Sequence, residues 1–395
     1  MTAPWDVVVV GARVAGASTA LLLARAGLRV LCLDRARHGS DTLSTHALMR
    51  PGTLLLRQWG LLDPIVEAGT PAVRRTVFHY GDETVSVTIR PAAGVDALYA
   101  PRRTVIDRVI ADAAAEAGAV VRFGTAVTGL LRDGDGRVTG VTTRARDGSA
   151  DAERAALVVG ADGRRSAVAD WVRAPVRAAG HASSAVLYGY WSGLAADGYE
   201  WFYRPGVSAG LIPTNDGLTC VFLGTDPATM DRLVRGGGTG AALDRLAAEC
   251  GVGARLAAGR RADAVRHVRG VPGRLRRAWG PGWALAGDAG QWKDPLSTHG
   301  MTDALRDAEL LARAVVAAPG PGRRQRDALA GYERARDRFA RPLLDASERV
   351  AGYGWDLPGV RRLLMDLSAV MADEVDLISS LPAAPWNAPA LARPA

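Results

Sequence analysis

The stretch from Trp5 to Asp34 reads WDVVVVGARVAGASTALLLARAGLRVLCLD. It begins with a β-branched run that ends at Val10, which predicts a strand. Small and apolar residues predict a helix over 15–25, with Gly27 as its stop signal. The apolar run 28–33 predicts a second strand. Both strands are apolar throughout, so we expect a βαβ unit in a parallel sheet buried on both faces.

The turn between the first strand and the helix has the position of a dinucleotide fingerprint, GxGxxG. It reads Gly11-Ala-Arg-Val-Ala-Gly16, and Asp34 follows 23 residues after Gly11. The helix amides would face a pyrophosphate, and the acid would accept ribose hydroxyls. Arg13 replaces the middle glycine, so its side chain must point away or itself contact phosphate. The alternative is an ordinary strand-turn-helix with a chance acid.

Further elements extend this unit. A helix is expected over 104–117, with Thr104 and Asp107 at capping-box spacing, then a strand over 120–123 and a hairpin between 127 and 144. The segments 73–90 and 185–225 alternate with period two and predict a separate antiparallel sheet. The glycine-rich run 236–240 reads as a loop, and the chain from Asp327 reads as helical.

The predicted fold class is therefore α/β: a Rossmann-like nucleotide-binding domain with an inserted antiparallel-sheet domain and a C-terminal helical segment. We expect a discontinuous first domain over 1–72, 91–183 and 270–325. The inserted substrate domain covers 73–90 and 184–269, and the helical region covers 326–395, with a frayed tail from Pro382.

Composition excludes several classes of protein. The 395 residues are 48% hydrophobic and 23% charged, which argues against a disordered or coiled-coil chain. No apolar run is long enough for a membrane span, and no basic segment precedes the first apolar run, so we expect a cytoplasmic protein. Three cysteines without metal spacing predict neither disulfides nor a metal site. The net charge of +8 comes from interleaved bases and acids, so no nucleic-acid partner is expected.

Two further segments carry a family resemblance. Gly160-Ala-Asp-Gly-Arg-Arg-Ser166, and Gly287-Asp-Ala289 followed by Pro295, resemble the DG and GD fingerprints of single-component FAD-dependent monooxygenases of the para-hydroxybenzoate hydroxylase type. The segments 40–46 and 293–295 resemble a bacterial branch of FAD-dependent oxidoreductases that is related to geranylgeranyl reductases. Order and spacing match over about residues 3–320.

The resemblance implies FAD as cofactor and NADPH or NADH as reductant. It implies that pyrophosphate lies at Gly11 and Gly16, ribose at Asp34, the flavin side at Arg103 and the ribityl chain at Asp288. The full set of cofactor-binding residues expected is Gly11, Ala12, Arg13, Ala15, Gly16, Asp34, Arg35, Arg103, Val127, Asp162, Asp288, Gly300 and Met301. This chain departs from the family where a glycine is replaced by Thr298 and an asparagine by Thr302. An arginine common near positions 44–46 is also missing.

Three residues on these segments are candidates for proton transfer: His46, Lys293 and His299. Lys293 is the one lysine among 49 basic residues. Each histidine could instead be a structural hydrogen-bonding group, and the lysine could form a salt bridge to Asp294 or Asp303. Aromatic residues are dense over 188–203. The substrate contacts expected are Tyr188, Tyr190, Trp201 and Tyr203, with core packing as the alternative.

The resemblance implies a monooxygenase that uses NAD(P)H and molecular oxygen, through oxygen addition to flavin carbon C4a, to hydroxylate or epoxidise a small aromatic or hydrophobic secondary metabolite. We expect a monomer or homodimer with no stable membrane insertion. One alternative is a hydride-transferring reductase of the geranylgeranyl reductase type. A flavin halogenase is weaker, because the run 211–213 lacks the tryptophan pair of that group. A non-catalytic flavin-binding protein is a further alternative.

Overall fold

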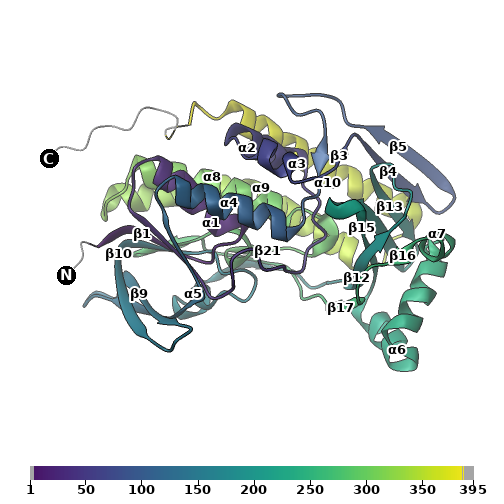
Figure 1. The fold of residues 1–395 in the computed structure, drawn as a ribbon, viewed down its shortest axis with the longest axis horizontal. Helices are drawn as coiled ribbons and strands as arrows, with labels where there is room; N and C mark the ends of the chain where they lie inside the picture. The colour runs from purple at the N-terminus through teal and green to yellow at the C-terminus, as the bar shows by residue number, and fades with distance from the viewer. Residues whose placement is uncertain (1–3, 385, 387–395) are drawn as a thin grey trace.

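Two large β-sheets stand side by side, and long helices run across both of them (Figure 1). The computed structural model describes residues 4–384 and 386. The path through the first sheet is β19 (Trp279–Gly280), β20 (Trp283–Leu285), β10 (Ala150–Gly160), β1 (Trp5–Val10), β2 (Val30–Asp34) and β7 (Val120–Phe123). Along this path the pairs from β20 to β7 are all parallel, while β19 pairs with β20 in the antiparallel direction.

Both faces of the first sheet are buried, as its apolar strands predict. Val7 and Val9 pack against helices α1 (Val14–Arg25), α4 (Arg103–Glu116) and α8 (Gly300–Ala317). Val8 and Val10 face the opposite way, toward the hairpin β8 (Thr125–Arg132) and β9 (Val138–Ala145) and the short helix α5 (Ala167–Trp171). Successive strand residues point to opposite faces, so a strand with an apolar layer on each side is apolar throughout.

The second sheet contains both segments that alternate with period two. Its path is β16 (Arg260–Arg261), β12 (Ala185–Ser192), β15 (Leu218–Thr225), β14 (Val207–Pro213), β13 (Tyr199–Arg204), β4 (Arg75–Tyr80) and β5 (Glu83–Thr88), with β17 (Arg266–Arg269) also on β12. The expectation of a purely antiparallel sheet is wrong at one point, because β13 and β4 pair in parallel. They come from distant segments, so no tight turn forces them to run in opposite directions.

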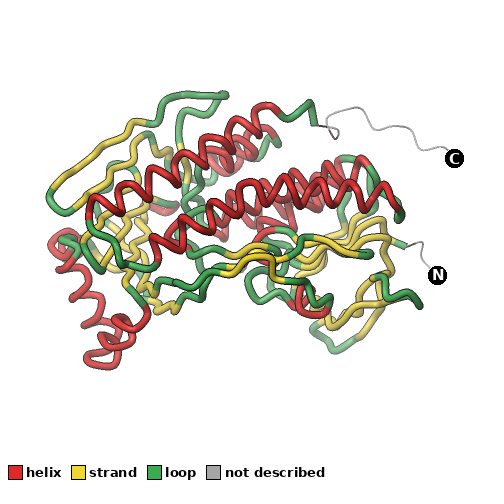
Figure 2. Tube along the Cα trace, turned by 180° about the vertical axis from the view of Figure 1, so that it is seen from behind, coloured by secondary structure: helices red, strands yellow, loops and turns green. Residues whose placement is uncertain are grey.

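Helices cover both faces of the second sheet. The long C-terminal helices α9 (Arg323–Ala351) and α10 (Leu357–Ser380) pack on the face that carries most of its aromatic residues. Helices α6 (Pro227–Glu249) and α7 (Gly253–Ala258) pack on the other face. Helix α9 also lies along α8, and α10 along α2 (Arg50–Gln58), which is followed by α3 (Leu62–Glu67). Figure 2 shows these long helices crossing from one sheet to the other.

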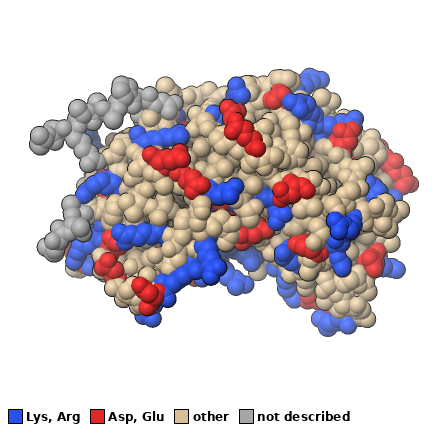
Figure 3. Space-filling view, in the orientation of Figure 1, with Lys and Arg blue, Asp and Glu red and all other residues tan. Residues whose placement is uncertain are grey.

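Small elements complete the fold. They are β3 (Ala72–Val73) paired with β6 (Leu98–Tyr99), the sheet β11 (Val176–Ala179), β18 (Arg274–Arg276) and β21 (Gln291–Trp292), and the 3-10 turns η1 (Asn215–Gly217), η2 (Gly287–Ala289) and η3 (Pro295–Ser297). None of the helices in the described residues combines the length and the apolar character that a bilayer crossing requires. On the face shown in Figure 3, basic and acidic groups are intermixed.

Two local expectations are wrong. The run 236–240 is not a loop, because it lies within α6, where Gly238 breaks the helical geometry with φ +78°. Nor do Thr104 and Asp107 form a capping box: α4 begins at Arg103, and no side chain caps it. The α/β class and the helical C-terminal segment are confirmed by the observed elements. The domain boundaries stay a prediction, and most of the expected frayed tail lies outside the described residues.

Candidate functional site

A cavity of about 640 Å³ opens where the two sheets meet. On one side it is lined by the turns that follow β1, β10 and β20, the carboxyl ends of three adjacent parallel strands. On the other side it reaches the second sheet at β12 and β15. Ligands of open α/β sheets bind at this edge, because the loops and helix N-termini there are free to contact them.

The turn after β1 brings backbone segments too close together for side chains. Gly11 has φ +101°, and a Cβ atom there would lie 2.4 Å from the carbonyl oxygen of Ala161. A Cβ atom on Gly16 would lie 1.8 Å from the carbonyl oxygen of Gly11. The N-terminus of α1 has no side-chain cap, so its first amides remain available for an anion at the cavity wall.

Asp34 at the end of β2 ties this turn together. Its carboxylate accepts hydrogen bonds from the amides of Ala12 at 2.8 Å and Ala36 at 2.7 Å. Asp34 also lines the cavity, as do Arg35 and Val127. A carboxylate can accept about four hydrogen bonds, so these two leave capacity for a ligand hydroxyl.

Asp107, on α4, holds two of the expected cofactor-binding arginines. Its carboxylate accepts hydrogen bonds from Arg13 Nη1 at 3.1 Å and Arg103 Nη2 at 2.9 Å. Both arginines line the cavity, and Asp107 is buried. Arg13, the residue in place of the fingerprint glycine, is therefore bound from α4. The Arg103–Asp107 pair has i,i+4 spacing and was readable from the sequence, although we expected Asp107 to cap the helix.

The remaining two motifs reach the same cavity. Asp162 accepts a hydrogen bond from Ser166 Oγ at 2.5 Å, and burial raises the pKa of its carboxyl group. Burial and the nearby Asp303 raise the pKa of Asp288 to about 6. Both acids line the cavity with Gly11, so the three separated motifs enclose one space.

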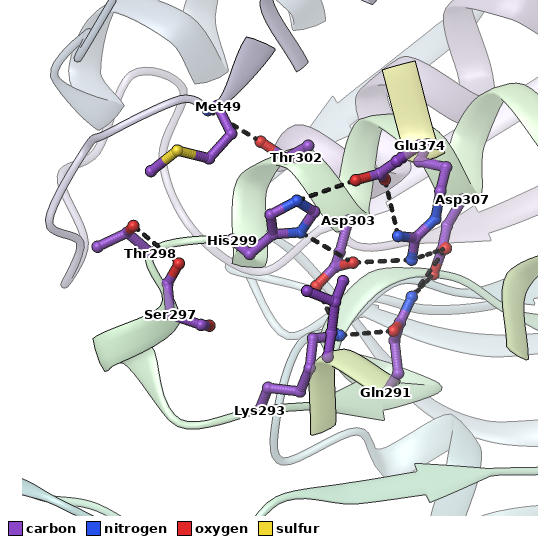
Figure 4. Close-up of polar contacts among 12 residues, drawn as sticks. Met49, Gln291, Lys293, Ser297, Thr298, His299, Thr302, Asp303, Asp307 and Glu374 are labelled. Atoms are coloured by element: carbon purple, nitrogen blue, oxygen red, sulfur yellow. Dashed lines mark hydrogen bonds and ion pairs between the residues drawn. The ribbon is translucent and has the colours of Figure 1, made fainter. Parts of the chain in front are cut away.

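Lys293 belongs to a buried ion network beside this cavity (Figure 4). Its Nζ lies 2.6 Å from Asp303 Oδ2 and donates to Gln291 Oε1 at 2.8 Å. Asp303 also pairs with Arg306, at 2.7 Å. Burial alone would raise the pKa of the Asp303 carboxyl group, but Lys293 and Arg306 hold that pKa well below its usual range. Lys293 and Asp303 both line the cavity.

His299 joins this network to the C-terminal helix α10. Its Nδ1 lies 3.2 Å from Asp303 Oδ1, and its Nε2 lies 3.0 Å from Glu374 Oε2. Burial disfavours the imidazolium, but Glu374 and Asp303 outweigh burial and raise the pKa of His299 to about 9. The imidazole is fully buried and does not line the cavity.

One atom from each of His299, Asp303 and Glu374 lies within 4.8 Å of the others, a spacing that a metal ion could use. However, Lys293 and Arg306 already bind these two carboxylates. The network thus has its cations supplied by side chains, and we assign no metal to it.

His46 lies behind the cavity wall and outside the cavity lining. Its Nε2 is 2.5 Å from the hydroxyl of Tyr190, and its backbone is in the left-handed region with φ +66°. Burial, with help from Arg103 and Arg102, lowers the pKa of His46 to about 3, so the ring is neutral near pH 7. Its predicted role in proton transfer stays a prediction.

The four aromatic residues expected at the substrate are all buried but occupy different positions. Tyr188 lines the cavity, where it is joined by Val186, Phe222 and Trp292. Tyr190 contacts His46, and Trp201 packs beside Phe222. Tyr203 packs against Trp355, which follows α9. The pattern of period two could not show that α9 and α10 would cover much of this face.

The N-terminus of α8, a helix that packs beside α1, lines the same cavity, and both departures from the family pattern lie at this end. Thr298 has φ +50°, the left-handed conformation for which glycine is favoured. Thr302 accepts a hydrogen bond from the amide of Met49 at 3.2 Å. Like α1, α8 has no side-chain cap, and Gly300 and Met301 line the cavity. Position 298 therefore keeps the left-handed backbone that a glycine would adopt, although its residue is the β-branched threonine.

Comparison with known proteins agrees with this geometry. The pattern of the FAD binding domain family matches residues 4–222, more than half of the chain. The chain belongs to this family. This confirms the resemblance on which FAD was expected. The three motifs enclose one cavity with two uncapped helix N-termini, a donor set that fits a dinucleotide, so FAD is its cofactor.

Two relatives differ in what they share with the chain. Aklavinone 12-hydroxylase RdmE of Streptomyces purpurascens is 34% identical over 183 residues, which cover 41% of this chain and 34% of that protein. The chain thus matches about a third of the hydroxylase. Digeranylgeranylglycerophospholipid reductase of Methanothrix thermoacetophila is 27% identical over 342 residues, covering 83% of this chain and 82% of the reductase.

Solved structures share the fold. The flavin-dependent brominase Bmp2 superposes with a TM-score of 0.80 at 17% identity, covering 95% of this chain and 93% of that chain. PqsL of P. aeruginosa, in complex with 2-aminobenzoylacetate, has a TM-score of 0.78 at 21% identity, covering 92% and 100%. At this identity the likeness concerns the fold alone.

Proposed function

We propose that the protein is an FAD-dependent monooxygenase that uses NAD(P)H and molecular oxygen to hydroxylate or epoxidise a hydrophobic, aromatic metabolite. The observation that carries the proposal is the continuity of the cavity. It runs from the phosphate-binding turn at Gly11 to apolar and aromatic side chains of the second sheet, among them Tyr188 and Phe222. A cofactor and a flat apolar substrate could therefore meet in one enclosed space.

In this proposal FAD lies with its pyrophosphate at the N-terminus of α1 and its ring at the N-terminus of α8. Asp34 and Arg35 would hold the adenosine ribose, and Asp288 the ribityl chain. Arg103 and Lys293 would supply positive charge near the ring. Two helix dipoles pointing at one cavity favour the negative charge of the pyrophosphate and of a reduced ring.

Bound FAD supplies the redox chemistry, and the chain supplies a dry and oriented site. Val186, Phe222 and Trp292 line the proposed substrate side with apolar surface, which disfavours water there. Burial raises the pKa of Tyr188 to about 12, so its phenol stays protonated and can donate a hydrogen bond to a substrate oxygen. Asp303 holds the Lys293 side chain beside the cavity, with Nζ 2.6 Å from Oδ2.

The match to the aklavinone hydroxylase supports a reaction that adds oxygen to a secondary metabolite. The longer alignment with the digeranylgeranylglycerophospholipid reductase favours a second candidate, a reductase that transfers hydride to a carbon–carbon double bond. The two candidates differ in one requirement, because only the monooxygenase consumes oxygen.

The deciding experiment is anaerobic reduction of the holoenzyme with NADPH or NADH, followed by mixing with oxygen in the presence of aromatic candidate substrates. We expect oxygen uptake coupled to product formation, with an absorbance transient distinct from oxidised and reduced flavin. Full release of hydrogen peroxide without product for every substrate would argue against oxygenation. Substrate reduction without oxygen uptake would favour the reductase.

The cofactor placement has a separate test in Asp288→Ala, for which we expect loss of bound flavin. The matched control is Asp133→Ala, in the exposed hairpin turn between β8 and β9, which should keep its flavin. A purified Asp288→Ala protein with full yellow colour would show that the placement is wrong.

A further inference from the structure

The C-terminal helix α10 places one buried acid, Glu374, against the N-terminal turn of α8 (Figure 4). Glu374 pairs with His299 through Oε2 at 3.0 Å and with Arg306 through Oε1 at 2.8 Å. All three side chains are fully buried. Burying a carboxylate costs free energy unless cations nearby compensate its charge. The contact between α10 and α8 at Glu374 therefore depends on its two cationic partners.

The six side chains that ion pairs join in this network are balanced in charge only when His299 is protonated. Its cations are then Lys293, His299 and Arg306, and its carboxylates are Asp303, Asp307 and Glu374. Asp307 has no other cation in the network, and it accepts from the amide of Gly287 at 3.0 Å. Loss of the His299 proton would leave one uncompensated negative charge in the interior.

The network reaches the cofactor cavity at two points. Lys293 and Asp303 line the cavity directly, and Asp303 raises the pKa of Asp288 on the same wall. Asp307 binds the backbone of Gly287, the residue before Asp288. An excess negative charge would thus lie beside the space for an anionic cofactor, where the low dielectric strengthens repulsion.

We propose that His299 and Glu374 are positioning residues of the FAD site: as a buried ion pair between α8 and α10, they complete the charge balance that keeps Lys293 and Asp303 in place beside the flavin. Neither residue contacts the cavity, so both act through Asp303 and Arg306. The inference rests on the proposed placement of the flavin, but it does not depend on whether the reaction is oxygenation or reduction.

The test measures FAD dissociation constants of the holoenzyme and three variants by flavin fluorescence. His299→Gln removes a cation and leaves the network one charge negative, so we expect FAD affinity to fall by about 5- to 150-fold. Glu374→Gln also removes the reason for His299 to be charged, so the network stays balanced and the loss is smaller. The double variant His299→Gln/Glu374→Gln is balanced again and should recover most of the affinity lost in His299→Gln.

The recovery separates charge balance from simple loss of contacts. If the two residues only pack the helices together, the double variant will bind FAD no better than His299→Gln, and the proposal fails. Asp373→Asn removes the same charge from the exposed neighbour of Glu374 and should bind FAD like the wild type. These FAD dissociation constants test the proposal whether the reaction is oxygenation or reduction.

A pH profile covers the case in which His299→Gln does not fold. In the wild type, FAD affinity should fall as pH rises through about 9, where His299 loses its proton. In Glu374→Gln the burial of the ring is no longer offset by two acids, so this alkaline transition should move to lower pH or vanish. An unchanged transition near pH 9 in Glu374→Gln would overturn the proposal.

Discussion

The cofactor cavity lies between two uncapped helix N-termini that are built in different ways. At α1, the close approach is made by backbone: Gly11 touches the turn after β10, and Gly16 touches Gly11. At α8, the approach is made through charge: Lys293 pairs with Asp303, Asp303 pairs with Arg306 on the same helix, and Arg306 pairs with Glu374 of α10. The first end excludes side chains, whereas the second end requires several of them.

Because of this difference, substitutions should disrupt the two ends of the cavity in different ways. A backbone contact leaves no room for even one methyl group, so small substitutions should be severe there. A charge network tolerates changes that keep its balance and fails when a single buried charge is left alone. The following substitutions test that contrast, beginning with the largest expected effect.

Gly11→Ala should weaken FAD binding by at least about 100-fold, or about 3 kcal/mol, since the new Cβ would meet the carbonyl of Ala161 and the φ of +101° is strained for alanine. Equilibrium flavin fluorescence measures the effect. Gly134→Ala is the matched control, because a Cβ atom there meets nothing within 4 Å. Near-normal affinity in Gly11→Ala would mean that the backbone contact does not govern this end.

Asp107→Asn should lower FAD affinity by about ten-fold, because it removes the charge that holds both Arg13 and Arg103 at the cavity. The loss should grow at high salt, where the freed arginines are screened from the pyrophosphate. Fluorescence titration at two salt concentrations provides the measurement. Glu116→Gln, exposed on the same helix, should leave the affinity unchanged.

Asp288 should make the flavin-free protein less stable as pH rises. Its pKa of about 6 in the folded state lies above the unfolded value, so the folded state binds the proton more tightly between about pH 4 and pH 6. The free energy of unfolding should therefore fall by about 2 kcal/mol across that range relative to Asp288→Asn. Denaturant unfolding at pH 4.5 and 7 tests this, and parallel pH dependences in both proteins would contradict it.

Thr298→Gly should raise the free energy of unfolding by about 0.5–1 kcal/mol, since glycine adopts the φ of +50° without strain. Thr298→Ala keeps a Cβ atom and should give no such gain, which makes it the matched comparison. Thermal unfolding monitored by circular dichroism is sufficient. Equal stabilisation by alanine and glycine would show that backbone strain is not the cause.

Much of the α1 end could be predicted because its determinants are local. The run before Gly11, the small residues after it and Asp34 lie within 30 residues, and the structure brings Gly11, Ala15 and Asp34 to the cavity wall. Asp162 and Asp288 were recognised from motifs rather than from local physics. The predicted capping box is wrong because Asp107 binds Arg13 and Arg103 instead. Only Arg103 has helical spacing to Asp107, so the contact with Arg13 could not be predicted from the sequence.

The α8 end could be predicted only in part. The lone lysine of the sequence points to Lys293, and of the two acids that the sequence offers it as salt-bridge partners, Asp294 and Asp303, the structure pairs it with Asp303. Arg306 and Glu374 were missed, because a buried charge on an amphipathic helix cannot be told from a solvated one until its partner is known. Tyr203 carries the same signal as Tyr188, yet one packs against Trp355 and the other lines the cavity.

The amino-acid sequence by itself determined the parallel core and the tight turn at Gly11, because these depend on residue size, backbone freedom and apolar runs that act over a few positions. The tertiary structure alone decided which charges are buried together and which face of the second sheet stays open to the cavity. Those outcomes depend on where α9 and α10 pack. The charge state of a buried group depends on its partners, and His299 and Glu374, 75 residues apart in the sequence, lie 3.0 Å apart in the structure.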